Sequence, residues 1–164
     1  MTLDDLPPGF APHTRHSPLT EPWEPIYARP DGHALQLGLR VREAHCNSRG
    51  FAHGGLISAL ADNAMGLSAV ATARAALPDD DTGAGKEPAA GAGVGTQSAR
   101  PRGAVTVSLT LDFTDSARIG DWLSIRPVVL KHGRTLAFTE AHVWAERGGD
   151  ERRVARASAT FRLG

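Results

Sequence analysis

The sequence is poor in several features that mark whole classes of protein. It has a single cysteine, Cys46, so neither an intrachain disulfide nor a cysteine-based metal site can form, and a reducing compartment is expected. Its 18 basic and 18 acidic residues give a formal net charge of +0, which argues against nucleic acid or a membrane surface as a partner. No stretch reaches about 18 uninterrupted apolar residues, and the acidic N-terminal segment is unlike a signal peptide. We therefore expect a cytoplasmic protein, and its 164 residues suit one domain.

Two segments lack the regular apolar pattern of a folded core. Residues 1–22 contain five prolines, which is typical of irregular chain. Residues 78–103 contain six glycines and three prolines around one large apolar residue, Val94, and bury too little surface to offset the entropy of ordering them. We expect an irregular N-terminal arm over 1–22 and a single domain over 23–164 that carries a flexible insertion at about 78–103.

The first half of the remaining chain predicts a hairpin followed by one long helix. Pro30-Asp31-Gly32 is typical of a turn, and it separates two extended segments, Pro25–Ala28 and His33–Val41. Residues 53–77 begin with a glycine pair and are then apolar around most of a helix circumference. A small domain tolerates such a helix only when other elements wrap it on several sides, so we expect it at the centre.

The second half changes to a period of two, which is typical of half-buried strands. In Val105–Phe113 the odd positions are apolar and the even positions are polar. Further strands are expected at Asp121–Leu130, Thr135–Glu146 and Arg152–Leu163, and the short turns between them predict an antiparallel meander. The pattern predicts an α+β fold in which a curled antiparallel sheet wraps around one long central helix. Because the sheet covers only one side of the helix, we expect a homo-oligomer.

The segment that leads into the helix, Asn47–Gly55, is the most informative part of the chain. Two glycines at a helix start cost roughly 0.5–1 kcal/mol each relative to alanine. One interpretation is that bare backbone N–H groups of Gly54 and Gly55, at the positive end of the helix, bind a developing oxyanion, with Asn47 as a side-chain donor. The alternative is that the glycines only allow close packing of the helix against the sheet.

Asp62 is an isolated carboxylate in the apolar helix. An unpaired buried charge is costly, so this residue is a candidate general base or nucleophile, or else a structural carboxylate bonded to backbone or arginine. Nine residues separate His53 from Asp62, which corresponds to about 13 Å along the helix and to opposite sides of it. If both ends of this segment are catalytic, the site lies between two subunits.

Other titratable residues give weaker hypotheses. Cys46 next to His45 suggests a thiol nucleophile, but neighbours in extended chain point to opposite sides. His45 and His53 supply too few ligands for a metal site, and His53 is expected to brace the loop. Lys131 and Arg134 lie at a strand turn and either bind phosphates or form an ordinary solvated turn.

These residues together resemble a known family. Asn47, Gly50, His53-Gly54-Gly55 and Asp62 reproduce the N-x-x-G-x-x-H-G-G-x(6)-D signature of PaaI-like acyl-CoA thioesterases of the hot-dog superfamily. The stretches 105–113, 116–121 and 133–138 are also similar to that family. The resemblance covers roughly residues 24–163, apart from the insertion.

The resemblance implies a function and a place for each motif residue. Similar enzymes hydrolyse an acyl-CoA thioester without metal or redox cofactor, as dimers or as a homotetramer made of two dimers, with sites between subunits. The Gly54 N–H and Asn47 would polarise the thioester carbonyl, and Asp62 of the other chain would activate water or attack directly. Thr106 would assist Asp62, although strand alternation places it on the polar face. Gly55 would contribute to substrate binding, and Lys131 or Arg134 would lie near the CoA phosphates.

Two other functions remain as alternatives. A hot-dog hydratase or dehydratase acts on enoyl or hydroxyacyl thioesters, but its usual histidine-containing loops are absent from this sequence. A non-catalytic acyl-CoA sensor would need an effector module such as a helix-turn-helix, which the proline-rich arm cannot supply. Hydrolysis of an acyl-CoA thioester is therefore the leading hypothesis.

Overall fold

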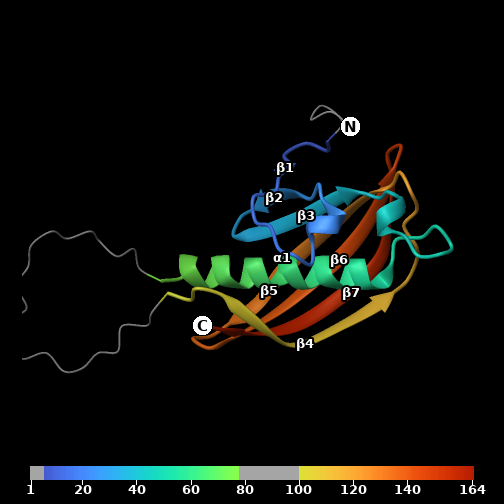
Figure 1. Ribbon diagram of the computed structural model, residues 1–164. Helices are drawn as coiled ribbons and strands as arrows, with labels where there is room; N and C mark the ends of the chain where they lie inside the picture. The colour runs from blue at the N-terminus through green and yellow to red at the C-terminus, as the bar shows by residue number, and fades with distance from the viewer. Residues whose placement is uncertain (1–5, 78–99) are drawn as a thin grey trace, which may run out of the picture.

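In the computed structural model, which describes residues 6–77 and 100–164, one long helix lies in the hollow of one curled antiparallel sheet (Figure 1). The helix is α1 (Gly54–Ala75). The strands run in the order β1-β2-β3-β5-β6-β7-β4 across the sheet. Their bounds are β1 (Ala11–Pro12), β2 (Tyr27–Asp31), β3 (Ala34–Arg40), β4 (Ala104–Phe113), β5 (Trp122–His132), β6 (Leu136–Arg147) and β7 (Asp150–Leu163). This is the hot-dog architecture that the resemblance implies.

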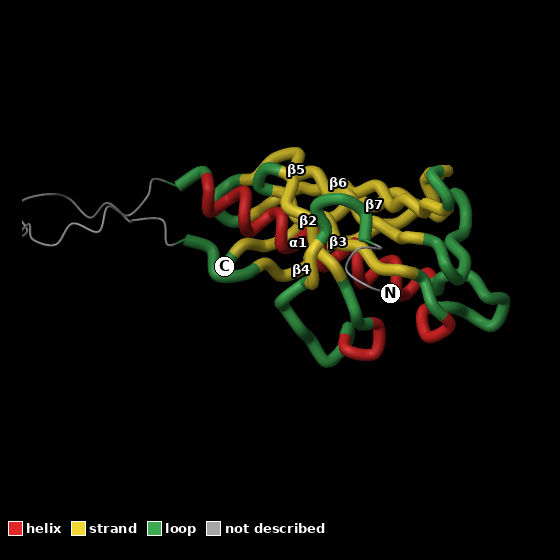
Figure 2. The backbone as a smooth tube through the Cα atoms, turned by 90° about the horizontal axis from the view of Figure 1, so that it is seen from above, coloured by secondary structure: helices red, strands yellow, loops and turns green. Residues whose placement is uncertain are grey.

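The helix is apolar because the sheet surrounds it. It contacts β3, β4, β5, β6 and β7, and in the view from above it runs alongside the strands over most of its length (Figure 2). By length and composition α1 would suffice to cross a membrane, but half of its apolar window is buried within this fold. The predicted central helix over 53–77 is therefore confirmed, with its ends within two residues of the expected ones.

Small side chains let the helix approach the sheet closely. Ala155, Ala157 and Ala159 of β7 face α1 and are at most 6% exposed. Gly66 of the helix lies against β7 as well, since a Cβ atom there would be 3.2 Å from the Phe161 ring. The small side chains of β7 therefore allow close packing of the helix on the sheet.

The expected meander of four strands is only partly correct. β5, β6 and β7 follow one another as neighbours, but β4 pairs with β7 at the far edge of the sheet and not with β5. The connection from Thr114 to Asp121 is too long for a tight turn and carries the chain from one side of β6 and β7 to the other. Short turns predict adjacency, and this longer link does not.

A β-bulge in β4 changes which side chains face the helix. Thr106 pairs with Phe161 and Ser108 pairs with Thr160, so Val107 is an extra residue with no partner. One extra residue inverts the alternation. Thr106 therefore faces α1, whereas Val105 and Val107 are 59% and 61% exposed. The expectation that Thr106 lies on the polar face, away from the helix, is wrong for this reason.

The N-terminal arm is more ordered than its composition predicts. β1 pairs with β2, and Phe10 is only 9% exposed, because it packs edge-on against Trp122 with ring centroids 5.1 Å apart. Trp122 in turn fills the space left by Gly38, where a Cβ atom would be 2.6 Å from its ring. The arm from Leu6 onward therefore lies on the domain. Most of the predicted insertion, residues 78–99, falls outside the described residues.

The docking of the arm leads to a prediction for its anchor. Replacing Phe10→Ala removes a buried aromatic ring and should lower the free energy of unfolding by about 3 kcal/mol. Urea denaturation measures this change. Leu19→Ala, in the same arm but at a 65% exposed side chain, is the matched control and should change the stability by no more than about 0.5 kcal/mol. Equal stability of the two variants would show that the arm does not dock.

Candidate active site

The loop before α1 is folded around Asn47. The backbone N–H of Asn47 donates to Phe51 O at 2.8 Å, and Gly50 N–H donates back to Asn47 O at 2.9 Å. Gly50 has a φ of +75°, which favours glycine. The Asn47 side-chain Oδ1 accepts the N–H groups of Arg49 and Phe51. Because Oδ1 is used within the loop, the Asn47 Nδ2 group is the part of the side chain left to donate outward.

His53 and the two glycines form the start of the helix. His53 is the N-cap residue, and its Nδ1 accepts the Gly55 N–H at 2.9 Å. Within the described parts of the chain, the Gly54 N–H donates to no acceptor. Gly54, rather than Gly55, therefore presents a free N–H at the positive end of α1.

Both glycines also satisfy a packing requirement. A Cβ atom at Gly55 would lie 3.0 Å from His53 Nδ1, and one at Gly54 would lie 3.2 Å from the ring of Phe113. The close-packing interpretation and the oxyanion interpretation of Gly54 are therefore compatible. His53 braces the loop, as expected from the sequence.

Asp62 and Thr106 meet between the helix and the edge strand. The Thr106 hydroxyl donates to Asp62 Oδ1 at 2.7 Å, across the gap between α1 and β4. Asp62 is half-buried. The structure thus brings together the two residues that the resemblance pairs, and it does so through the bulge at Val107.

The glycine pair and the carboxylate do not meet within one chain. Gly54 lies beside Phe113 at the end of β4, whereas Asp62 is bonded to Thr106 near the beginning of that strand. Seven positions separate Thr106 from Phe113, which corresponds to roughly 20 Å along the strand. Within one chain the Gly54 N–H and the Asp62 carboxylate are therefore far apart.

The segment 115–121 packs against the loop 47–53 and holds it in place. Ala52 N–H donates to Ala117 O at 2.8 Å, and Phe51 forms a bridge with Arg118. The Arg118 guanidinium lies 5.6 Å from the centre of the Phe51 ring. The loop is thereby fixed to the connection between β4 and β5.

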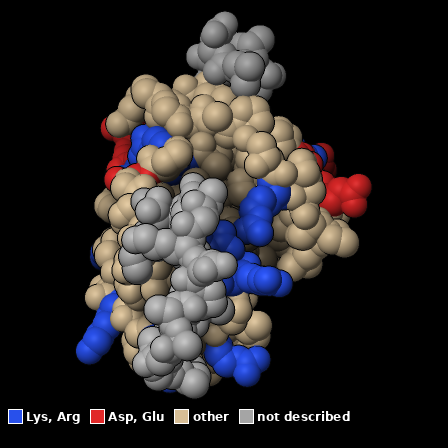
Figure 3. Space-filling model, turned by 90° about the vertical axis from the view of Figure 1, so that its left-hand side faces the viewer, with Lys and Arg blue, Asp and Glu red and all other residues tan. Residues whose placement is uncertain are grey.

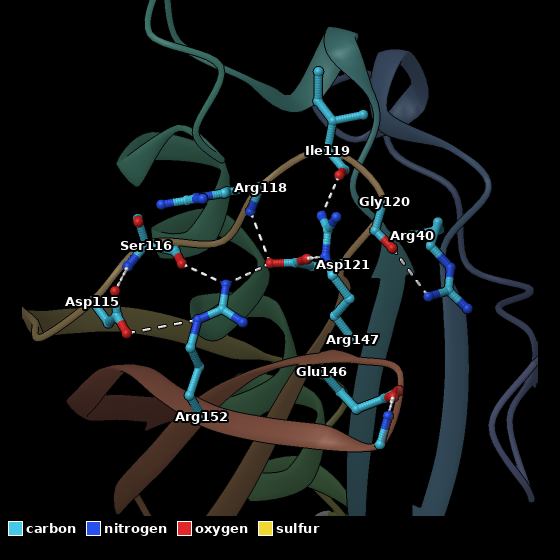
Figure 4. Close-up of polar contacts among 11 residues, drawn as sticks. Arg40, Asp115, Ser116, Arg118, Ile119, Gly120, Asp121, Glu146, Arg147 and Arg152 are labelled. Atoms are coloured by element: carbon cyan, nitrogen blue, oxygen red, sulfur yellow. Dashed lines mark hydrogen bonds and ion pairs between the residues drawn. The ribbon is translucent and has the colours of Figure 1, made fainter.

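A buried carboxylate, Asp121, holds that connection in place. Figure 4 shows its two oxygens between Arg147 and Arg152, at 2.6 Å from each guanidinium, and the Arg118 N–H donates to the same carboxylate at 2.9 Å. Burial alone would raise the pKa of Asp121, but these three donors together hold its pKa below the usual range. The resemblance included Asp121 only as the end of the stretch 116–121 and gave it no role, whereas the structure shows that it positions the loop through this network.

His45 is a second support of the loop. It is 2% exposed, its Nδ1 accepts the Arg42 N–H at 3.1 Å, and its Nε2 lies 2.9 Å from Trp23 O. An acceptor at Nδ1 and a donor at Nε2 describe a neutral imidazole. Burial lowers the pKa of His45.

The thiol hypothesis for Cys46 is wrong. Burial raises the pKa of the Cys46 thiol, and its Sγ faces Arg42 O at 3.4 Å, while the His45 ring is occupied by backbone groups. Among the described residues no imidazole is therefore available to deprotonate the thiol, and the nearby Glu43 carboxylate further disfavours the thiolate. Among the residues that the structure describes, no three His, Cys, Asp or Glu side chains form a metal-binding group.

A groove of about 240 Å³ contains the Asp62–Thr106 pair. It follows the outer side of α1 from Asp62 to Arg74 and is closed on the other side by the beginning of β4. Lys131 and Arg134 do not line this groove. Arg134 borders a separate cavity of about 270 Å³ at the C-terminal end of α1, and Lys131 is exposed on β5.

With this geometry established, comparison with known proteins identifies the family. A model of the thioesterase superfamily matches residues 49–151, which include the helix start, Asp62 and Thr106. The chain belongs to the thioesterase superfamily.

Relatives of the whole chain and of its core support this assignment. A Pseudomonas aeruginosa protein named as an esterase, PA0474, is 39% identical over 160 residues, covering 97% of this chain and 98% of that protein. Human acyl-coenzyme A thioesterase 13 is 29% identical over 101 residues, covering 62% of this chain and 54% of that enzyme.

Solved structures of the superfamily share the fold. A point mutant of the phenylacetic acid degradation protein PaaI from Thermus thermophilus superposes with a TM-score of 0.62 at 22% identity, over 89% of this chain and 98% of that one. A hypothetical thioesterase from Streptococcus pneumoniae with coenzyme A has a TM-score of 0.62 at 19% identity, over 86% and 90% of the two chains. These similarities show the hot-dog fold.

The neutral His45 leads to a prediction for the pH dependence of stability. Its pKa is lowered in the folded protein, so the unfolded state binds more protons as the pH falls below about 6.5, and stability must decrease there. We expect the free energy of unfolding, measured in urea at pH 7.5 and 5.5, to fall in the wild type and to fall less in His45→Gln. His13, whose pKa burial also lowers, remains in both proteins and cancels in this difference. An identical pH dependence would contradict the role assigned to His45.

Proposed function

We propose that this protein hydrolyses an acyl-CoA thioester to the free carboxylic acid and coenzyme A. The observation that carries the proposal is the hydrogen bond from Thr106 to Asp62, which holds a carboxylate in a groove at the edge of the sheet. The named acyl-coenzyme A thioesterase among the relatives and the coenzyme A complex among the solved structures support the choice of substrate.

The chemistry divides between two groups of atoms. A carboxylate that accepts one hydrogen bond from Thr106 keeps its second oxygen for the reaction, where it removes a proton from water or attacks the thioester carbonyl. The carbonyl oxygen gains negative charge in either case. The Gly54 N–H at the helix start and the Asn47 Nδ2 group are the donors that stabilise this charge.

Pairing of two β4 strands would complete the site. β4 is an edge strand of ten residues that pairs only with β7 among the strands described. An antiparallel pair of such edges around a two-fold axis sets the beginning of one β4 against the end of the other. Asp62 and Thr106 of one protomer then come next to Gly54 of the other, and each dimer holds two sites. A homotetramer would contain two such dimers.

The role of Asp62 leads to a kinetic prediction. Asp62→Ala should lower kcat by about 10²- to 10⁴-fold with a smaller effect on KM, because a base or nucleophile acts mainly in the transition state. Thr106→Val should lower kcat less, by about 10-fold, because the Thr106 hydroxyl only orients the Asp62 carboxylate. Release of free thiol from a panel of acyl-CoA substrates measures both, and a hydratase would release none.

Asp112, a carboxylate of β4, provides the control for Asp62. Asp112 lies on the opposite face of β4, where it pairs with Arg156, so Asp112→Ala should retain wild-type turnover. Activity of Asp62→Ala within threefold of the wild type would refute the catalytic assignment.

The shared site leads to a second prediction. Co-assembled Asn47→Ala and Asp62→Ala subunits form mixed dimers with one doubly damaged site and one intact site. Random assembly makes about half of the dimers mixed, so activity should recover to roughly a quarter of the wild type, far above either variant alone. Native mass spectrometry verifies the mixed species. If the mixture shows only the average of the separate variants, Asp62 acts within its own chain or not at all.

A further inference from the structure

Three arginines from separate segments line the groove that contains Asp62. Arg15 comes from the N-terminal arm, Arg74 from the last turn of α1, and Arg102 from the chain just before β4. Arg74 and Arg102 lie at the end of the groove that is remote from Asp62, where Arg74 donates to Arg102 O, and Arg15 lines the same groove. Figure 3 shows this end of the molecule, where basic side chains predominate and acidic ones lie toward the margins.

These arginines differ in what holds them. Arg74 donates to Pro101 O at 2.7 Å and to Arg102 O at 3.3 Å, so it ties the beginning of β4 to the end of the helix. The guanidinium groups of Arg15 and Arg102 are exposed and pair with no carboxylate among the residues described. The one carboxylate that lines the groove in the described chain, Asp62, lies at its other end and already accepts a hydrogen bond from Thr106. The cluster is therefore cationic, without a counterion from these parts of the protein.

The spacing between the two ends of the groove suits one part of a CoA thioester. Twelve positions separate Asp62 from Arg74, which is about 18 Å along the helix. The pantetheine arm joins the thioester sulfur to the first phosphorus through about 13 bonds, comparable with four residues of extended peptide or about 15 Å. Gly66, Leu67 and Val70 form an uncharged, apolar wall between the two ends.

We propose that Arg15, Arg74 and Arg102 form the subsite that binds the phosphate groups of the CoA moiety while its thioester lies at Asp62. This inference rests on the proposed hydrolysis of acyl-CoA and names the residues that recognise the coenzyme. Guanidinium groups bind phosphate oxygens through paired charge-assisted hydrogen bonds, which suits this role. The subsite replaces Lys131 and Arg134 and gives the N-terminal arm a function in substrate recognition.

A substrate pair that differs only in its nucleotide and phosphates tests the subsite. Acyl-CoA and the matching acyl-pantetheine carry the same thioester, but only acyl-CoA carries phosphates. Arg102→Gln and Arg15→Gln should each raise KM for acyl-CoA about 5- to 20-fold at nearly constant kcat, as expected for one charge-assisted contact at an exposed position. Neither should change KM for acyl-pantetheine more than twofold. Arg74 is left intact because it also holds the backbone.

A control variant and a binding measurement distinguish a phosphate subsite from a general loss of affinity. Arg162→Gln removes an exposed arginine of β7 that does not line the groove, and it should leave both KM values unchanged. Calorimetric titration of the wild type and Arg102→Gln with CoA and with pantetheine gives the same comparison without catalysis, so it decides the subsite even if the hydrolytic function fails. If Arg102→Gln weakens the binding of CoA and of pantetheine equally, the proposal of a phosphate subsite is wrong.

The same three arginines could instead bind a carboxylate on the acyl group, because guanidinium groups bind carboxylates as well as phosphates. Pantetheine thioesters of a monocarboxylic and a dicarboxylic acid distinguish this source from the coenzyme. Suppose that Arg102→Gln raises KM only for the dicarboxylic thioester and leaves the difference in KM between acyl-CoA and acyl-pantetheine unchanged. The cluster then recognises the acyl group, and the phosphate subsite is wrong. If Arg102→Gln affects KM for the two pantetheine thioesters equally and raises KM selectively for acyl-CoA, the result supports the phosphate subsite.

Discussion

The burial of a 22-residue apolar helix is the constraint on which the rest of the structure depends. A single sheet can cover such a helix only by curling around it, and the alanines of β7 together with Gly66 of α1 let the two layers approach. The curl ends at β4, and among the described residues no strand covers the side of the helix beyond this edge. The groove with Asp62 lies along that open side, so the position of the site follows from how the helix is packed.

The start of the same helix carries the N–H group that we propose stabilises the oxyanion. A helix start leaves N–H groups without partners, and here His53 caps Gly55 while the Gly54 N–H stays free of any acceptor in the described chain. Close contact with Phe113 excludes a side chain at Gly54. The Asp121 network and the neutral His45 hold the loop on either side, at a distance from any reacting group. The loop is rigid because buried polar groups satisfy one another around it.

Local patterns predicted the parts of the molecule that depend on near neighbours. The helix, the hairpin and the four long strands follow from periodicity and turn residues, and the motif from Asn47 to Asp62 supplied the residues of the proposed site. The place of β4 was wrong because pairing across the sheet is decided by long-range packing, which short turns do not encode. Phe10 and Arg15 were missed because a proline-rich segment shows its contacts only when the surface beneath it is known.

Thr106 shows most clearly why a local pattern fails at a functional position. A regular β4 would turn Val105 toward the helix and Thr106 away from it, as the unbroken alternation from Val105 to Phe113 predicts. The bulge at Val107 reverses this and leaves both valines largely exposed, although burial of one valine side chain stabilises a fold by about 1.5 kcal/mol. The hydrogen bond that Thr106 gains at the Asp62 carboxylate contributes about 1.5–3 kcal/mol, which is comparable with that loss. Proteins break the binary pattern in this way where a site requires it, and the bulge places the Thr106 hydroxyl on Asp62, which is the arrangement that the proposed function needs.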